Sequence, residues 1–271
     1  MNPRVSSALI IIPFVLLIIV LGRIYLAVMI FILGMMCINE FYKLAELSGY
    51  SPLDKVGIIG VAAFTVIGYL GLQQAVDIVV AVVFIASMVW QVLTFEDRNP
   101  IADSAITLFG SIYVGLPLAT GLLLRCSGDN KTGLGYFLTA ILTIWATDIG
   151  AYYGGRTFGK HKLSPKISPN KTYEGAISGL VCGIIVGVAA RSFGAVYMWW
   201  PNLNPVHSIM LALIASVFGQ IGDLSESAFK RNARVKDSGV FMPGHGGVLD
   251  RLDSLLLAIP MVYYYVRLFL S

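Results

Sequence analysis

The chain has 271 residues, of which 57% are hydrophobic and 13% are charged, with a formal net charge of +4. Soluble domains carry roughly 25% charged residues. This composition and the long aliphatic runs exclude a soluble globular domain and predict an all-α, polytopic membrane protein. The unbroken runs also exclude a membrane β-barrel, whose strands alternate apolar and polar residues.

Apolar runs predict about nine transmembrane helices. In chain order they lie near residues 7–21, 24–42, 56–72, 75–95, 101–124, 133–154, 174–194, 206–229 and 247–269. Gly22 and Arg23 barely separate the first two, so a tight helical hairpin and one broken helix remain alternatives, the second giving eight spans. Arg4 precedes the first run as in a signal peptide, but no small-residue cleavage site follows, so we interpret this run as a retained span.

The distribution of basic residues predicts the orientation, because cytoplasmic loops carry an excess of Lys and Arg. With nine spans and the N-terminus inside, fourteen of the nineteen Lys and Arg residues fall in inner segments or at the start of the last helix. The outer loop at residues 196–207 has neither Lys nor Arg and holds Trp and Tyr, which is typical of a membrane interface. We therefore expect an integral membrane protein with its N-terminus and its polar site at the cytoplasmic face. A bacterial inner membrane is the expected location, which the charge distribution does not itself establish.

The two halves of the chain differ in character. Residues 1–130 are interpreted as N-terminal transmembrane scaffold helices, and residues 131–271 as a C-terminal catalytic transmembrane region of the same integral membrane unit. Gly, Pro, Asn, His and Asp gather in two inner loops, residues 155–173 and 230–246. The positive-inside rule and binding to anionic lipid explain the positive charge of these loops but not this clustering.

Three predicted spans of the C-terminal half carry acids close to those loops. Asp148 lies in the sixth span, and Asp250 and Asp253 open the ninth. The eighth carries four polar residues at helical spacing on one face: Asp223, Glu226, Ser227 and Lys230. Carboxylates from several helices form a hard-oxygen site of the kind that Mg²⁺ prefers. The alternative is a simple helix-end role, above all for Asp253, whose charge favours a helix N-terminus.

Basic residues and glycines lie beside these acids. The first loop holds Arg156, Lys160, Lys162, Lys166 and Lys171, and the second Lys230, Arg231, Arg234 and Lys236. Gly246 and Gly247 precede a helix N-terminus and form a candidate anion cradle, with His245 beside them as a candidate ligand or base. Together these features predict phosphoryl or nucleotidyl transfer. A P-loop-like run at residues 154–161 is rejected, because His161 replaces the metal-binding hydroxyl and the run follows a helix.

The run at residues 227–254, SAFKRNARVKDSGVFMPGHGGVLDRLDS, closely resembles the signature of the phosphatidate cytidylyltransferase family, also called CDP-diacylglycerol synthases. The matching positions are Ser227, Lys230, Arg231, Lys236, Asp237, Pro243, His245, Gly246, Gly247, Asp250, Arg251 and Asp253. Met242 stands where the family usually has Ile or Leu, which is a swap of similar volume. The upstream run DIGAYYGGRTFGKHKLSPKISPNKTYEG is also similar to an inner loop of the family. The detailed match covers about the last 130 residues.

The resemblance implies that phosphatidic acid attacks the α-phosphorus of CTP on the cytoplasmic side of the membrane, giving CDP-diacylglycerol and pyrophosphate. It also implies Mg²⁺ dependence, with a second cation left open, and a homodimer. CTP, phosphatidic acid and the lipid bilayer are the expected partners, and nucleic acid is not. An apolar lateral cleft between spans is expected to let the acyl chains stay in the bilayer.

The resemblance and the residue chemistry together assign roles. Two unit charges about 4 Å apart repel by about 4 kcal/mol at an effective dielectric constant of about 20, so charge neutralisation is expected to dominate catalysis. The predicted metal ligands are Asp223 and Asp250, supported by Asp253 and Glu226. The predicted catalytic residues are Asp223, Asp250, Lys230, Arg231, Arg251 and His245, the last assisting pyrophosphate departure. The predicted substrate-binding residues are Asp148, Lys166, Asn170, Lys171, Glu174, Ser227, Lys236, Asp237, Gly246 and Gly247. For Asp148, Asn170 and Glu174, positioning of the cytidine and completion of the metal shell remain alternatives.

Three classes of rival function are weaker: a secondary transporter, a different membrane transferase and a purely structural membrane protein. A secondary transporter would show repeat symmetry and polar sites at the membrane midplane. A CDP-alcohol phosphatidyltransferase needs a D-x2-D-G-x2-A-R pattern and a polyprenyl-phosphate sugar-1-phosphate transferase an Asp-Asp pair, and the sequence has neither. A purely structural membrane protein has no reason to keep Asp148, Asp223 and Asp250 in or beside its spans.

Overall fold

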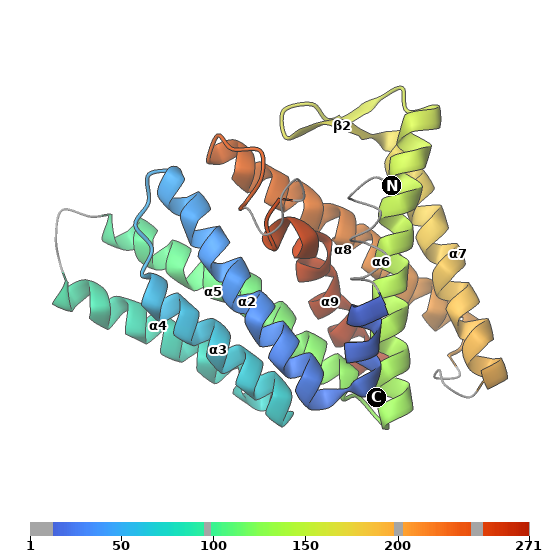
Figure 1. Ribbon diagram of the computed structural model, residues 1–271, viewed down its shortest axis with the longest axis horizontal. Helices are drawn as coiled ribbons and strands as arrows, with labels where there is room; N and C mark the ends of the chain where they lie inside the picture. Colours follow the sequence, from blue (N-terminus) through green and yellow to red (C-terminus); the bar gives the residue numbers. More distant parts are fainter. Residues whose placement is uncertain (1–12, 95–98, 198–202, 240–245, 271) are drawn as a thin grey trace. The chain divides into compact units, whose positions relative to one another are not determined.

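The computed structural model describes residues 13–94, 99–197, 203–239 and 246–270, most of which are helical (Figure 1). Residues 13–21 form a first helix. The others are α2 (Arg23–Leu47), α3 (Asp54–Leu70), the short 3-10 helix η1 (Gln73–Ala75), α4 (Val76–Leu93), α5 (Pro100–Arg125), α6 (Asn130–Phe158), α7 (Tyr173–Tyr197), α8 (Pro205–Asn232) and α9 (Leu249–Phe269). The prediction of a helical, polytopic membrane protein is confirmed.

The number of spans is a separate question. Among the described residues, seven helices are long and apolar enough to cross a membrane, namely α2 and α4 to α9. Helix α3 lies where the third span was predicted, but its 17 residues fall short of the roughly 20 that a bilayer usually requires. The first predicted span lies partly outside the described residues. The count of nine is therefore not confirmed.

The chain forms two compact units. Unit 1 comprises Met1–Leu123 and Asn232–Arg251, and unit 2 comprises Leu124–Arg231 and Leu252–Ser271. The sequence analysis placed one boundary near residue 130. That division stays a prediction; in the structure, the stretch Asn232–Arg251, which carries much of the signature, groups with the N-terminal helices.

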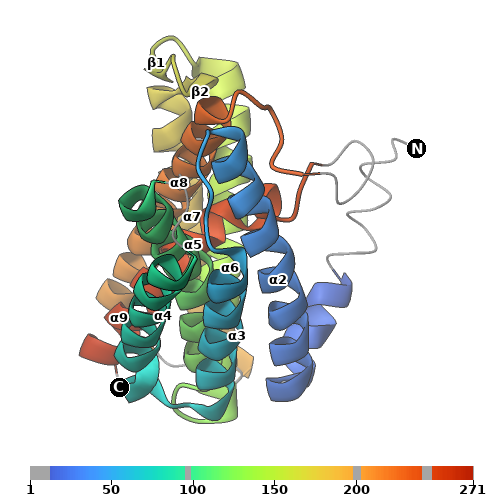
Figure 2. The ribbon, with the colours of Figure 1, turned by 90° about the vertical axis from the view of Figure 1, so that its left-hand side faces the viewer.

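Unit 1 is built on helices α2 to α5, which lie side by side (Figures 1 and 2). Phe64 of α3 is fully buried in an apolar cluster with Val83 of α4 and Ala119 of α5. Close packing depends on glycine: at Gly68, a Cβ atom would lie 2.8 Å from the backbone oxygen of Ala119. Small residues at such crossings let membrane helices approach closely. The result is a tightly packed bundle that holds the C-terminal end of α2.

Unit 2 contains a close helix pair, α6 and α7. Helix α7 places Gly175, Gly179, Gly183 and Gly187 four residues apart, and such residues share one face of a helix. A Cβ at Gly175 would lie 2.8 Å from the Ala151 carbonyl oxygen, and one at Gly179 would lie 2.6 Å from the Thr147 oxygen. The two backbones are therefore in direct contact, as in small-xxx-small packing of membrane helices.

A short β-hairpin joins α6 to α7 (Figure 1). Strand β1 (Lys162–Ser164) pairs antiparallel with β2 (Ser168–Thr172), with Lys162 opposite Thr172. The hydroxyl of Thr172 then accepts a hydrogen bond from the Gly175 N–H at 3.1 Å, which caps the start of α7. The sequence analysis predicted only a loop here, because the prolines and lysines of this run are typical of loops.

Helix α6 is capped at its start. The Asp129 carboxylate accepts a hydrogen bond from the Thr132 N–H at 2.8 Å, and hydrogen bonds from Thr132 lower the pKa of Asp129 below its ordinary value. At the other end of α6, the Gly159 N–H donates to the Gly155 carbonyl oxygen, shortly before strand β1 begins.

Candidate active site

The predicted site residues gather on a few elements. In unit 2, Asp148 lies on α6, Lys166 between the two strands, Asn170 and Lys171 on β2, Glu174 on α7, Asp223, Glu226, Ser227, Lys230 and Arg231 on α8, and Asp253 on α9. In unit 1 lie Lys236, Asp237, Gly246, Gly247, Asp250 and Arg251. His245 falls outside the described residues.

The C-terminal end of α8 carries the polar face that its spacing predicted. Glu226 is fully buried and forms an ion pair with Lys230, one turn further along the helix. The Ser227 hydroxyl lies 3.5 Å from Asp223 Oδ1. A buried carboxylate is tolerated when it is paired, so the Glu226–Lys230 pair accounts for an acid in this position.

The hairpin meets this face of α8 through two contacts. Lys171 Nζ lies 2.8 Å from Asp223 Oδ2. Arg231 Nε donates a hydrogen bond to the Ile167 carbonyl oxygen at 3.1 Å. Lys171 of the hairpin and Arg231 of α8 therefore lie at the same end of unit 2, and their predicted role in binding phosphate stays a prediction.

Glu174 closes the base of the hairpin. Its carboxylate accepts hydrogen bonds from the Lys160 N–H at 3.1 Å and the His161 N–H at 3.2 Å, and it lies 2.6 Å from the His161 ring Nδ1. These bonds give Glu174 a clear part in holding the hairpin to the start of α7. Its predicted role in substrate binding stays a prediction.

Three acids from three helices of unit 2 form what we call the carboxylate cluster: Asp148 of α6, Asp223 of α8 and Asp253 of α9. Asp148 interacts electrostatically with Asp223 and with Lys171, and Asp253 interacts with Asp223, Asp148 and Lys230. Like charges in such proximity repel, and Lys171 and Lys230 offset part of the repulsion. The cluster therefore concentrates negative charge from three helices of unit 2, partly offset by the two lysines.

The donor chemistry of the carboxylate cluster fits Mg²⁺, which prefers carboxylate oxygens. Among the residues that the structure describes, however, no group of three or more His, Cys, Asp or Glu side chains is arranged closely enough to hold a metal ion. The prediction that Asp250 shares a metal ion with Asp223 stays a prediction, because these residues lie in different units.

The signature residues of unit 1 form a second arrangement, at the start of α9. Asp250 Oδ2 accepts hydrogen bonds from the Gly247 N–H at 2.7 Å and from the N–H and the hydroxyl of Ser238, each at 2.9 Å. Gly246 has φ +78°, a left-handed conformation that favours glycine, and a Cβ there would lie 2.7 Å from Asp250 Oδ2. Asp250 is thus hydrogen-bonded to both Ser238 and Gly247, the two ends of what we call the signature loop, residues 238–247.

A residue that the sequence analysis missed completes this arrangement. Glu40 of α2 accepts hydrogen bonds from the Val248 N–H at 3.0 Å, the Leu249 N–H at 2.8 Å and the Ser238 hydroxyl at 2.9 Å. The predicted anion cradle at Gly246 and Gly247 therefore has donors, and in this structure the protein's own carboxylates accept from them. An acid within the apolar segment MMCINEFY was the available signal for Glu40.

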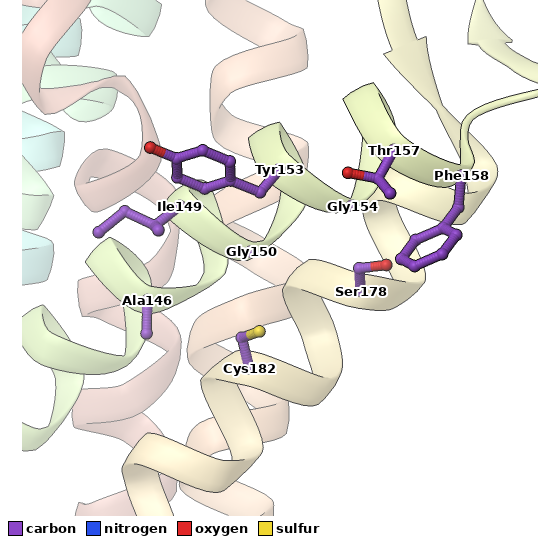
Figure 3. Close-up of a pocket in the computed structure, with 9 residues that line it drawn as sticks. All are labelled: Ala146, Ile149, Gly150, Tyr153, Gly154, Thr157, Phe158, Ser178 and Cys182. Carbon is purple, nitrogen blue, oxygen red and sulfur yellow. The ribbon is translucent and has the colours of Figure 1, made fainter.

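An apolar groove of about 580 Å³ runs along α6 and α7 in unit 2 (Figure 3). Ile149, Tyr153 and Phe158 of α6 line it, together with Ser178 and Cys182 of α7. It extends to Thr157 and Phe158, in the last turn of α6 before the basic hairpin. It is an apolar surface of the kind that the sequence analysis expected for acyl chains.

Comparisons with known proteins agree with the signature. A family model described as the cytidylyltransferase family matches residues 2–269. The phosphatidate cytidylyltransferase of Bacillus subtilis (strain 168) is 30% identical over 280 residues, which cover 99% of this chain and 98% of that protein. The phosphatidate cytidylyltransferases of Staphylococcus haemolyticus (strain JCSC1435) and Staphylococcus aureus (strain COL) are each 42% identical over 167 residues. These two matches span 62% of this chain and 60% of the relative.

Proposed function

Because the chain belongs to the cytidylyltransferase family, we propose that it transfers the cytidylyl group of CTP to phosphatidate, giving CDP-diacylglycerol and pyrophosphate. The observation that carries this proposal is the match to the Bacillus subtilis phosphatidate cytidylyltransferase over almost the whole of both chains. The acids and bases that unit 2 gathers on α6, β2, α8 and α9 support it, because nucleotidyl transfer requires such a combination.

The reaction makes one P–O bond and breaks another. A phosphate oxygen of phosphatidate attacks the α-phosphorus of CTP, and the bond from that phosphorus to the bridging oxygen breaks. The bonding electrons leave with pyrophosphate. The attacking phosphate is already ionised near pH 7, so no strong general base is required. The main barrier is the approach of two anions, which nearby positive charge lowers.

The basic residues of unit 2 are placed to supply that charge. Lys171 and Lys230 lie against Asp223 and Glu226, so each lysine is held by a carboxylate until an anionic substrate competes for it. Arg231 reaches the hairpin through the Ile167 carbonyl and brings a guanidinium to the same end of α8. We propose that these three side chains bind phosphate groups and stabilise the charge on the leaving pyrophosphate.

We propose that Asp223 and Asp253 would bind Mg²⁺ together with substrate phosphates, since these two acids interact electrostatically and Mg²⁺ is usually held by one or two carboxylates plus phosphate oxygens. When bound, the ion would neutralise phosphate charge and polarise the phosphorus centre. Whether a second cation binds, and whether the protein is the homodimer that the resemblance implies, stay predictions.

The proposed activity predicts a defined product. Purified protein in detergent, given Mg²⁺, radiolabelled CTP and phosphatidate, should form a lipid-soluble cytidylate and an equal amount of pyrophosphate, measured by thin-layer chromatography and a coupled pyrophosphate assay. Glycerol 3-phosphate presents the same phosphate without acyl chains, and it should be a poor acceptor because it gains nothing from the apolar groove.

Two controls make this assay decisive. Radiolabelled ATP in place of radiolabelled CTP should give no labelled lipid. Removal of Mg²⁺ with EDTA should stop the reaction. Release of pyrophosphate without formation of a lipid product, from protein that is monodisperse and folded, would contradict the proposed transfer.

We also propose that the hairpin end of unit 2 faces the cytoplasm of a bacterial inner membrane, with the N-terminus on the same side. The support is the positive-inside rule: Lys160, Lys162, Lys166 and Lys171 lie in or beside the hairpin, whereas the connection from Gly71 to Ala75 has no Lys or Arg. The helices α4, α5 and α6 separate the two segments, and three crossings place them on opposite sides.

Cysteine labelling tests this orientation. Starting from a variant in which Cys37, Cys126 and Cys182 are Ala, Gln73→Cys and Lys160→Cys each introduce one exposed thiol. In intact spheroplasts, a membrane-impermeant maleimide should label the cysteine at position 73 and spare the one at position 160. After lysis, both should react. Labelling of position 160 in intact spheroplasts would reverse the orientation.

A further inference from the structure

Helix α2 carries a buried acid, Glu40, that contacts residues some 200 positions further along the chain. Its side chain is 9% exposed. One carboxylate oxygen, Oε1, accepts from the Val248 N–H, and the other, Oε2, accepts from the Leu249 N–H and the Ser238 hydroxyl. All of these residues belong to unit 1. A buried carboxylate is strongly unfavourable unless hydrogen bonds compensate for lost hydration, and these three bonds provide that compensation.

Glu40 caps α9 from a different helix. The first N–H groups of a helix have no partner within the helix, and the partial positive charge there favours an anion. At the start of α9, the Val248 and Leu249 N–H groups point to Glu40, and the preceding Gly247 N–H points to Asp250. Three successive donors are thus shared between two carboxylates, one from α2 and one from α9 itself.

The signature loop is shaped around this carboxylate. A Cβ at Gly239 would lie 2.6 Å from Glu40 Oε1, and a Cβ at Gly247 would collide with Glu40 Oε2 and with the Ser238 hydroxyl. Contacts under 3.0 Å require the neighbouring atom to move, and a buried, hydrogen-bonded carboxylate has little room to do so. Both glycines therefore permit the backbone to close over Glu40.

Glu40 is coupled to Asp250 through one hydroxyl. Ser238 Oγ lies 2.9 Å from Glu40 Oε2 and 2.9 Å from Asp250 Oδ2. A serine hydroxyl has one proton, so it donates to one of these carboxylates at a time. The remaining donors to Asp250 are the N–H groups of Ser238 and Gly247. Glu40 therefore fixes both segments of backbone that hold the Asp250 side chain.

We propose that Glu40 is a positioning residue for the cytidylyl transfer: it fixes the start of α9 and the residue Ser238, and through them the orientation of Asp250. This inference rests on the proposed function. It gives part of the N-terminal half a role in the reaction beyond that of a scaffold. Glu40 acts through Asp250 and does not itself touch the substrates.

Glu40→Gln tests the proposal with almost no change in size. The amide keeps one acceptor oxygen but turns an NH₂ group toward the N–H donors of Val248 or Leu249, which cannot bond to it. We expect kcat to fall about 10-fold or more, the usual scale for a residue that orients a functional group, with a smaller change in the KM for CTP. Glu46→Gln is the matched control, because Glu46 lies exposed on the same helix, and its kcat should equal that of the wild type.

Two further measurements separate positioning from general stability. Amide hydrogen exchange of a peptide covering residues 246–253 should speed up in Glu40→Gln while the rest of α9 keeps its protection. In an Asp250→Asn background, Glu40→Gln should add less than about a twofold loss, because a residue that acts through Asp250 has nothing left to position.

The outcomes are distinct. Failure of the wild type to form CDP-diacylglycerol would overturn the proposed function itself. An active wild type with an unchanged kcat in Glu40→Gln, whatever its unfolding temperature, would overturn the positioning role. The positioning role would also be overturned if Glu40→Gln and Asp250→Asn reduced kcat by independent factors.

Discussion

Asp223→Asn is expected to lower kcat/KM by at least about 100-fold, the scale of one lost electrostatic contact in a transition state. Asp223 interacts with Asp148 and Asp253 and lies 2.8 Å from Lys171 Nζ. Asparagine keeps the size of the side chain and removes its charge. The loss should follow from weaker binding of a cation at the carboxylate cluster, so the residual activity should need a higher Mg²⁺ concentration than the wild type.

Stability should change little in this variant. The side chains of Lys171 and Asp223 are 26% and 35% exposed, and an ion pair that is open to solvent contributes at most about 1 kcal/mol. Asp77→Asn is the matched control, because Asp77 is an exposed acid in the first turn of α4, and it should keep wild-type kcat/KM. Steady-state assays over a Mg²⁺ titration supply the measurement. Wild-type activity in Asp223→Asn would remove Asp223 from the catalytic centre.

Asp250→Asn is expected to reduce activity by a similar factor of at least about 100, but with a clear loss of stability. Asp250 Oδ2 accepts hydrogen bonds from the N–H groups of Ser238 and Gly247 and shares the Ser238 hydroxyl with Glu40. Bonds to a charged group contribute about 1.5–3 kcal/mol each, and a neutral amide oxygen replaces them only in part. The signature loop should therefore loosen, and the unfolding temperature in detergent should fall.

Asp223→Asn and Asp250→Asn are expected to lose activity to a similar extent, but only Asp250→Asn is expected to lose stability. Asp54→Asn removes an exposed acid from the first turn of α3 and serves as the control for both activity and unfolding temperature. If Asp250→Asn retained wild-type activity, Asp250 would have no part in the reaction. If it lost activity with no change in unfolding temperature or in the exchange of the loop amides, the loop-closing bonds would not explain its importance.

Local features of the site could be predicted from the sequence, because they depend on the spacing of residues that are close together in the chain. The i, i+3, i+4 and i+7 pattern from Asp223 to Lys230 lies on the helix that it predicted, and its last member pairs with Glu226. The signature at residues 227–254 identified the family, which the comparisons confirmed. Apolar runs located helices α2 to α9 to within a few residues, because an unbroken apolar run of this length favours a helix.

Contacts between residues that are far apart in the sequence could not be predicted from such short spacings. The segment around Glu40 has the pattern of an ordinary helix end, and nothing nearby predicts that its carboxylate reaches Val248 and Leu249. The pairing of Lys171 with Asp223 likewise depends on how the hairpin folds back onto α8. The hairpin itself lies in a run that prolines and lysines make typical of a loop, and long-range packing overrides that local tendency.

The glycine series of α7 has a mechanical consequence for the basic hairpin. Where two backbones touch at successive turns, rotation or sliding of α7 against α6 would bring backbone atoms into collision. The strands between them are joined to the start of α7 through hydrogen bonds of Glu174 and Thr172. The close helix pair therefore gives the strand that carries Lys171 a well-defined support.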